Sequence, residues 1–149
     1  IVDIYYLIEM NRYKEYFDIM EIDIHNSDFA KQYFAFYKDD IARFFPNFKI
    51  HPEKSYRAVF CLRNARPVNL IVVSDISEKE TLIELDYVIP EYRDMKNGKY
   101  FYRKGVKKLG LNIDQTFVSK TSNVFHKKYL KTLGFEKVNE EDGIAVFKK

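Results

Sequence analysis

Three basic residues surround a point where the chain is expected to enter a helix. Arg93, Lys96 and Lys99 lie around Gly98, and residues 93–131 carry 11 Lys or Arg against 2 Asp or Glu, a net charge of +9. A helix N-terminus has backbone N–H groups without partners and the positive end of the helix dipole, so such a turn binds phosphate well. The sequence therefore predicts an anion site at this turn. The alternative is that these charges only form a solvated face.

Two carboxylates precede this turn on a predicted strand. Glu84 and Asp86 are two residues apart, and alternate residues of a strand point to the same face of a sheet. We therefore expect the two side chains to share a face. In a partly dry cleft the pKa of such a carboxyl group rises, which suits a general base. On a solvent-facing surface both carboxylates would simply be hydrated.

The histidines and the cysteine indicate less chemistry. His25, His51 and His126 are dispersed without the spacing of metal ligands, so no metal site is predicted and His126 is expected at the surface. Cys61 falls in a predicted strand, where a cysteine is usually a small buried apolar group. A single cysteine also excludes an internal disulfide.

Hydrophobic periodicity places these residues on a succession of strands and helices. Alternation of apolar and polar residues predicts a strand, and apolar residues at intervals of three or four predict a helix. Residues 1–8 are ambiguous between the two. The expected strands are 17–24, 56–62, 68–76, 81–89, 113–119, 135–138 and 144–147, and the expected helices are 29–44, 98–109 and 123–133.

The order of these elements predicts an α/β fold. Strands 56–62, 68–76 and 81–89 follow one another through short turns, which favours antiparallel pairing. Helix 98–109 separates strand 81–89 from strand 113–119, and a crossover of this kind makes its two strands parallel. We expect a mixed, mostly antiparallel sheet flanked by helices, with one parallel strand pair in a βαβ unit.

The composition is that of a globular domain. Of the 149 residues, 46% are apolar and 32% are charged. No repeat or domain boundary is evident, so residues 1–149 are expected to form a single domain. No uncharged run reaches the roughly 20 residues of a membrane helix, and the chain shows neither a secretory signal nor an initiator Met. We expect a cytoplasmic protein, with the chain itself as a candidate fragment of a longer one.

Two segments resemble the GCN5-related N-acetyltransferase (GNAT) superfamily. Residues 88–99 read Val-Ile-Pro-Glu-Tyr-Arg-Asp-Met-Lys-Asn-Gly-Lys, similar to the strand end and glycine-containing turn that open a helix in that family. A later helix carries Asn123 and ends in Leu-Gly-Phe at residues 133–135, as it does in the family. The element order over about residues 15–149 also matches. The resemblance implies a GNAT-like fold and an acyl-CoA-dependent N-acyltransferase, normally an acetyltransferase, that acts on a small-molecule or peptide amine.

The resemblance also implies which residues hold acetyl-CoA or another acyl-CoA. Backbone groups near Tyr87, Val88 and Ile89 would meet the pantetheine arm, which the side chain of Asn123 would also contact. Backbone amides of the turn would hold the pyrophosphate, with one arginine side chain nearby. The turn comprises Arg93, Asp94, Met95, Lys96, Asn97, Gly98 and Lys99.

Two positions depart from the family pattern. Lys96 stands where the first glycine of the turn is usual, and there it either crowds the pyrophosphate or binds it. The tyrosine that protonates the departing thiolate is expected seven residues after Asn123, and this position is Leu130. Tyr129 is one residue earlier, about 100° around the helix. It is the candidate acid that remains.

Three functions stay open on this evidence. The first is transfer of an acyl group from acyl-CoA to an unknown amine, aided by Glu84 or Asp86, because a carboxylate on this strand often serves as the base in the family. The second is a catalytically degenerate domain that binds CoA as a sensor or acts as an interaction module. The third is binding of nucleic acid or an anionic surface by residues 93–131, against which the total charge of only +3 argues.

Overall fold

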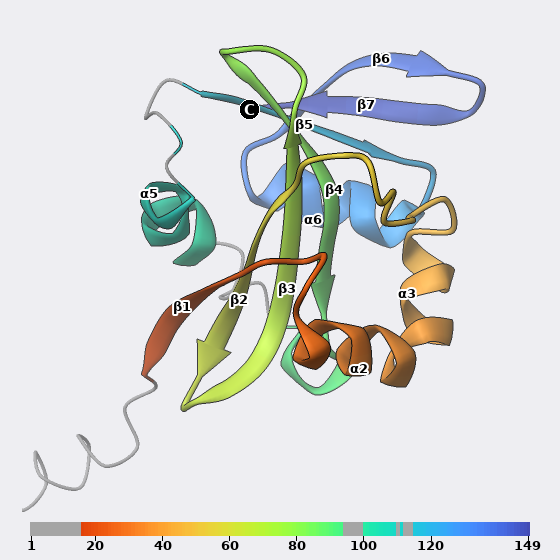
Figure 1. Ribbon diagram of the computed structural model, residues 1–149. Coiled ribbons are helices and arrows are strands. Elements are labelled where there is room, and N and C mark those ends of the chain that lie inside the picture. The colour runs from red at the N-terminus through yellow and green to blue at the C-terminus, as the bar shows by residue number, and fades with distance from the viewer. Residues whose placement is uncertain (1–15, 94–99, 110, 112–114) are drawn as a thin grey trace, which may run out of the picture.

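A computed structural model describes residues 16–93, 100–109, 111 and 115–149 of the chain. The described strands form a seven-stranded sheet in the order β1-β2-β3-β4-β5-β7-β6 (Figure 1). β4 and β5 are parallel, and the other neighbouring strands are antiparallel. This confirms the predicted mixed sheet and its parallel pair. The strands are β1 (Phe17–Ile22), β2 (Arg57–Arg63), β3 (Arg66–Asp75), β4 (Glu80–Val88), β5 (Thr116–Thr121), β6 (Glu136–Glu141) and β7 (Ile144–Lys148).

Short helices connect and cover the strands. They are α2 (Asp28–Phe36), α3 (Lys38–Phe44), a 3₁₀ turn (Pro90–Tyr92), a π-helical turn (Phe101–Gly105) that continues into α5 (Val106–Lys108), and α6 (Val124–Thr132). The helix predicted over residues 29–44 is two helices, because the backbone of Tyr37 leaves the helical region (φ −100°, ψ 15°). None of the helices that the structure describes has the length and apolarity required to cross a bilayer.

A two-residue turn joins β2 to β3. Asn64 and Ala65 both have positive φ, 51° and 67°, as in the type I′ turns whose twist matches that of an antiparallel hairpin. Asn tolerates this conformation because its short polar side chain can bond locally. The Asn64 side chain accepts a hydrogen bond from the N–H of Tyr16 at 2.9 Å.

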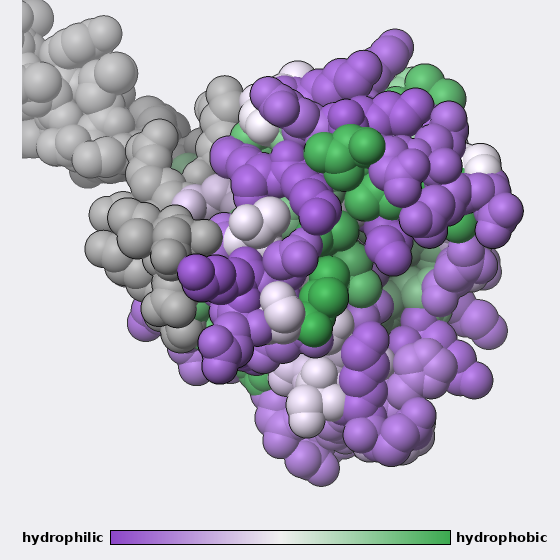
Figure 2. Space-filling view, turned by 90° about the horizontal axis from the view of Figure 1, so that it is seen from above, coloured by the Kyte–Doolittle hydropathy of each residue, from purple (hydrophilic) through white to green (hydrophobic). Residues whose placement is uncertain are grey.

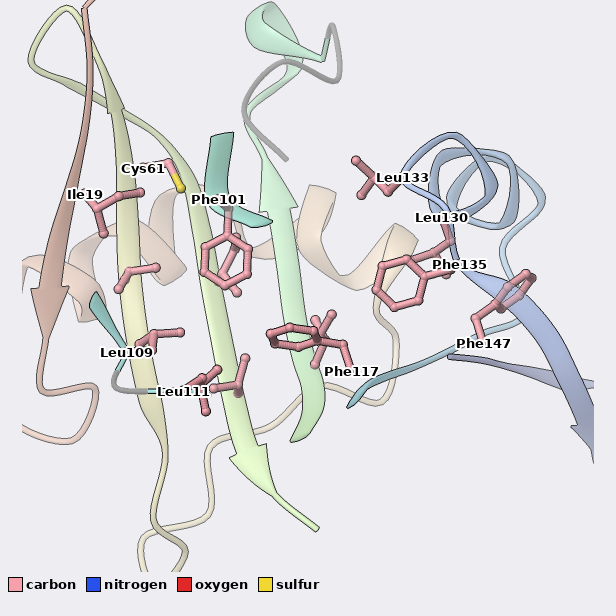
Figure 3. Packing of buried hydrophobic residues seen from close by; sticks show 14 of the residues in the cluster. Ile19, Cys61, Phe101, Leu109, Leu111, Phe117, Leu130, Leu133, Phe135 and Phe147 are labelled. Carbon is pink, nitrogen blue, oxygen red and sulfur yellow. The ribbon is translucent and has the colours of Figure 1, made fainter. Parts of the chain in front are cut away.

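Helices pack on both faces of the sheet. α2 and α3 cover one face, which we call the α3 face, and the π-helical turn, α5 and α6 cover the other, which we call the α6 face (Figure 1). Alternate strand residues divide between the two cores: Val59 and Cys61 of β2 lie on the α6 face, whereas Phe60 lies on the α3 face. Figure 3 shows the α6-face core, in which fully buried Cys61 packs as the small apolar group predicted.

β6 forms one edge of the sheet. All six of its residues are exposed. Seen from above, the surface of the molecule is largely hydrophilic with a narrow apolar strip (Figure 2). Four of the six residues are charged, and Lys137 pairs with Glu140 at 3.3 Å. Charged side chains on an edge strand discourage pairing with another chain.

Candidate active site

β4 and β5 separate part of the way along their length. They pair only as far as Ile83 and Ser119. Beyond this point β4 continues beside β3 to Val88, whereas β5 continues beside β7 to Thr121. Within the described chain, the β4 edge over residues 84–88 therefore has no strand beside it on the β5 side.

A β-bulge in β4 coincides with this separation. Val72 of β3 pairs with Leu85 and Val73 pairs with Ile83, so Glu84 is an extra residue between them. A bulge interrupts the regular alternation of side chains along a strand. The alternation on which the sequence prediction relied is therefore broken at Glu84, and it resumes from Leu85 with the two faces exchanged.

The bulge separates the two carboxylates that were expected to share a face. The Oε1 atom of Glu84 accepts hydrogen bonds from Lys54 Nζ and Ser74 Oγ, both at 2.6 Å. Ser74 alternates with Val72 on the α3 face of β3. Asp86 instead lies on the α6 face, beside groups of that core. The prediction of a shared face is wrong, because it assumed an unbroken strand.

A cleft of about 500 Å³ lies along the free edge of β4. One wall is formed by residues 86–88 of β4, and the facing wall is formed by Phe125, His126 and Tyr129 of α6. Phe44 at the end of α3 borders the cleft as well. The divergence of two parallel strands thus opens a space between β4 and the helix that follows β5.

The rotation of α6 decides which of its side chains reach the cleft. Asn123 caps the helix: its Oδ1 accepts a hydrogen bond from the N–H of His126 at 3.0 Å. Leu130 is 1% exposed and packs in the α6-face core with Leu133 (Figure 3). Tyr129, one residue earlier, lines the cleft. Of the two candidate positions Tyr129 borders the cleft and Leu130 does not, and Asn123 caps the helix and does not line the cleft. Which residue donates a proton stays a prediction.

His126 is a cleft residue that the sequence analysis placed at the surface. It is 7% exposed, and its ring meets that of Phe45 edge to face with 5.0 Å between centroids. Burial lowers its pKa to about 4, so the ring is neutral near pH 7. A histidine three residues after a helix cap carries no local signal of burial, since burial depends on the distant Phe45.

Asp86 lies at the inner end of the cleft and is 5% exposed. Burial raises its pKa to about 6, and the nearby side chains of Asn69 and Tyr129 partly oppose this rise. Neither carboxylate oxygen has a hydrogen-bond partner in the described part of the chain. Burial also holds the pKa of the Tyr129 hydroxyl well above its usual value, and the Asp86 charge adds to this effect. Tyr129 therefore keeps its proton.

The backbone of β4 presents alternate residues to the cleft. The N–H of Ile89 donates to Val68 O at 3.0 Å, toward β3, and in an antiparallel ladder every second residue bonds to the same neighbour. Tyr87 therefore also directs its backbone N–H and C=O toward β3. The backbone N–H and C=O groups of Asp86 and Val88 point the other way, toward the cleft. Three residues were expected to meet a pantetheine arm. Val88 directs its backbone toward the cleft, whereas Tyr87 and Ile89 direct theirs toward β3.

Arg93 connects the end of β4 to α3. Its Nε donates to Val88 O at 2.9 Å, and its guanidinium pairs with Asp40 and lies over the ring of Phe44 at 4.7 Å. The Tyr87 hydroxyl donates to the same Asp40 carboxylate at 2.5 Å. Although burial acts against it, these bonds from Tyr87 and Arg93 lower the pKa of Asp40. Sequence analysis could not find this clamp, since its partners are 53 residues apart.

The rest of the predicted phosphate turn lies outside the described residues. This concerns Asp94, Met95, Lys96, Asn97, Gly98 and Lys99. The turn stays a prediction, as does the effect of Lys96 in the place of a glycine.

A smaller cavity of about 220 Å³ adjoins the cleft. It is bordered by Glu84, by Phe48 after α3 and by Ser122 between β5 and α6, and it shares Phe44 and Phe45 with the cleft. The two cavities are therefore neighbours that share this pair of aromatic residues. Glu84 borders the smaller cavity, and Asp86 and Tyr129 border the larger.

No protein-family model and no curated protein sequence matches the chain. Solved structures do match it. The N-acetyltransferase PseH of Campylobacter jejuni is 15% identical, with a TM-score of 0.60 over 88% of this chain and 96% of that one. A domain from Methanocaldococcus jannaschii is 14% identical, with a TM-score of 0.64 over 91% and 99%.

A third match was solved with a ligand. The PaiA N-acetyltransferase of Thermoplasma acidophilum, in complex with coenzyme A, is 14% identical, with a TM-score of 0.55 over 63% of this chain and 60% of that one. At these identities the likeness concerns the fold. The fold predicted from the GNAT resemblance is confirmed, and it is the fold of solved N-acetyltransferases.

Proposed function

We propose that the protein is an acyl-CoA-dependent N-acyltransferase that acylates a small-molecule or peptide amine. The observation that carries this proposal is the cleft between the separated strands, with a protonated tyrosine on its α6 wall and with the Glu84 carboxylate in the smaller cavity that adjoins it. The fold likeness to N-acetyltransferases, one of them solved with coenzyme A, supports the same reading.

The cleft suits an acyl-CoA in two respects. Beyond Ile83 no described strand pairs with β4 on the β5 side, so the backbone groups of Asp86 and the N–H of Val88 are available there, whereas Val88 O accepts from Arg93. An extended pantetheine arm can pair with such an edge as an added strand does. The cleft volume of about 500 Å³ is within the range of small-molecule sites. Bound acyl-CoA supplies the thioester. The turn at residues 93–99 is the proposed holder of its pyrophosphate.

Two side chains move the protons of the transfer. A nitrogen–carbon bond forms and a carbon–sulfur bond breaks, so the amine loses a proton and the leaving thiolate gains one. Glu84 is the proposed base. Lys54 and Ser74 hold it in place through Oε1, and no hydrogen bond among the described residues engages Oε2. Tyr129 is the proposed acid. Its raised pKa keeps the proton available until the thiolate leaves.

The test begins with binding and continues with turnover. Isothermal titration with CoA and acetyl-CoA is expected to give micromolar dissociation constants, and thiol release with a panel of amines is expected to identify acceptors. Tyr129→Phe should then lower kcat by roughly 10²–10⁴-fold, the usual range for a general acid. Tyr102→Phe is the matched control, because this buried hydroxyl also lies near Asp86 but does not line the cleft.

The outcomes separate the candidate functions. Absence of CoA binding overturns the proposal. Binding without turnover of any amine favours a non-catalytic CoA-binding module, the alternative that the sequence left open. Equal loss of activity in both tyrosine variants would contradict the role of Tyr129 and leave a structural role for both.

A further inference from the structure

Two buried polar side chains, Asp86 and Tyr129, line the cleft, and a third, Asn69, lies beside Asp86. Asn69 of β3 is 0% exposed, Asp86 of β4 is 5% exposed, and the hydroxyl of Tyr129 is buried beside them. We call these three residues the polar floor. The Asn69 and Tyr129 side chains lie close enough to Asp86 to lower its pKa. Within the described chain, however, both polar atoms of Asn69, both carboxylate oxygens of Asp86 and the Tyr129 hydroxyl lack a hydrogen bond of good geometry.

Such a set is unusual in a protein interior. Most buried polar side-chain atoms are hydrogen-bonded, and each buried group without a partner calls for an explanation. Leaving a buried donor or acceptor unsatisfied is costly, and more so for a charged group. A leucine at position 86 would avoid this cost. The floor is therefore expected to gain its partners from a molecule that enters the cleft.

The charge of Asp86 is not balanced by the nearby arginines. Arg93 and Arg43, which also border the cleft, are both paired with Asp40 on α3. The groups that act on Asp86 are neutral side chains, those of Asn69 and Tyr129. The carboxylate thus lacks both a cation and a hydrogen-bond donor in good geometry. A ligand that brings either of these would be held at this point.

The position of the floor indicates which part of a ligand would reach it. The outward backbone groups of Asp86 and Val88 suit the pantetheine arm, as argued above. The Asp86 side chain points from the same strand toward the α6 face, next to Tyr129, the proposed donor of a proton to the thioester sulfur. A group bonded to the thioester carbonyl lies within a few atoms of that sulfur. The acyl chain is therefore the part of the donor that meets the floor.

We propose that the polar floor selects acyl-CoA donors whose short acyl chain ends in a hydrogen-bond donor, a hydroxyl or an ammonium group, over apolar chains of the same length. This inference rests on the proposed acyltransferase function and specifies its donor. Asp86 is the residue that determines the preference, the Tyr129 hydroxyl is its neighbour in the cleft, and Asn69 lies beside Asp86 and positions its carboxylate.

Three thioesters of equal chain length provide the test. Butyryl-CoA, 3-hydroxypropionyl-CoA and 3-aminopropionyl-CoA differ only in a terminal methyl, hydroxyl or ammonium group. Isothermal titration of the parent protein is expected to show at least tenfold tighter binding of the two polar chains, since hydrogen bonds to charged groups are among the stronger ones. Free CoA serves as the reference for binding of the shared arm.

Two variants assign the preference to Asp86. Asp86→Leu should bind butyryl-CoA more tightly than either polar chain. Asp86→Asn keeps an acceptor but removes the charge, so it should retain the hydroxyl preference and lose the ammonium preference. Asp75→Asn is the control, because this exposed carboxylate at the end of β3 pairs with Arg57 away from the cleft. Its three dissociation constants should equal those of the parent.

The results that overturn the inference differ from those that overturn the proposed function. If the parent binds CoA but binds butyryl-CoA as tightly as the polar chains, the floor does not select the donor. If a polar preference persists in Asp86→Leu, another part of the protein is responsible, and the inference is again wrong. If no CoA compound binds, the acyltransferase proposal fails, and the donor preference fails with it.

Discussion

The two faces of β4 give its two carboxylates opposite surroundings. On the α3 face, Glu84 is held by Lys54 and Ser74 at 2.6 Å. On the α6 face, Asp86 is buried without a hydrogen-bond partner in the described chain. The residues are two apart on the same strand and would be nearly equivalent on a regular one. Their difference originates in the bulge, which places one extra residue in β4 opposite Val72 and Val73.

The comparison shows how one inserted residue creates two sites. A shift of one residue moves side chains to the other face of a sheet. Glu84 consequently borders the smaller cavity, and Asp86 borders the cleft. We infer that the first carboxylate serves the amine and the second serves the acyl donor. The following predictions test this division, beginning with the largest expected effect.

Removing each carboxylate in turn should have unequal effects on acetyl transfer. Glu84→Gln is expected to lower kcat by roughly 10²–10⁴-fold, because an amide cannot accept the proton of the amine. Asp86→Asn should change kcat for acetyl-CoA by less than about tenfold, because an acetyl group has no terminal hydrogen-bond donor for the floor to bind. Thiol release measures both. A larger loss in Asp86→Asn would reverse the assigned roles.

On α6, substitutions of the core residue Leu130 should change stability, because Leu130 is buried and only its neighbour Tyr129 lines the cleft. Leu130→Ala is expected to lower the free energy of unfolding by about 2–5 kcal/mol, because it leaves a cavity in the α6-face core. Leu130→Tyr should also destabilise, by about 1–3 kcal/mol, through overpacking. Exposed Lys131→Ala is the control and should stay within about 0.5 kcal/mol. Urea denaturation measures all three. An active, fully stable Leu130→Tyr would show that position 130 can reach the cleft.

The pH dependence of stability should have opposing contributions from Asp86 and His126. Asp86 has a pKa of about 6 when folded against 3.8 for the free group. The folded state thus binds its proton more tightly, and its contribution to stability falls as pH rises from about 4 to 6. His126 has a pKa of about 4 against 6.5, so its contribution falls as pH drops from 6.5 to 4. Each amounts to about 3 kcal/mol at 1.36 kcal/mol per pKa unit.

Single variants should reveal each contribution. Relative to the parent, Asp86→Leu should gain stability as pH rises from 4 to 6, since only the His126 contribution remains. His126→Phe should show the reverse trend over the same window. Urea unfolding at pH 4, 5 and 6 measures both. Parallel curves for the parent and Asp86→Leu would mean that Asp86 is not buried as a free carboxylate.

The smallest expected effect concerns the ion pair on the α3 face. The hydrogen bond to Glu84 raises the pKa of Lys54, but the Lys54 side chain is 42% exposed, so Lys54→Met should cost less than about 1 kcal/mol of stability. Lys148→Met is a matched control, because Lys148 is equally exposed and pairs with Glu80 at 3.1 Å. Both variants should be similarly stable. Only Lys54→Met should change kcat, and equal rates would argue against Glu84 as the base.

Local patterns in the sequence determined most of the architecture. Apolar periodicity located the strands and α6, and the helix between strands 81–89 and 113–119 identified the parallel pair that β4 and β5 form. The sequence motif that begins at Val88 predicted that the end of β4 belongs to the site. These features are predictable because they depend on neighbouring residues: side chains repeat every two residues in a strand and every 3.6 in a helix.

Only the tertiary structure decided how the side chains of the site are placed. The bulge at Glu84 depends on how β3 and β4 pair. The rotation of α6, which buries Leu130 and turns Tyr129 to the cleft, depends on packing against the sheet. The burial of His126 depends on Phe45, and the engagement of Arg93 depends on Asp40. Each joins residues far apart in the chain, so the periodicity of one segment contains no information about it.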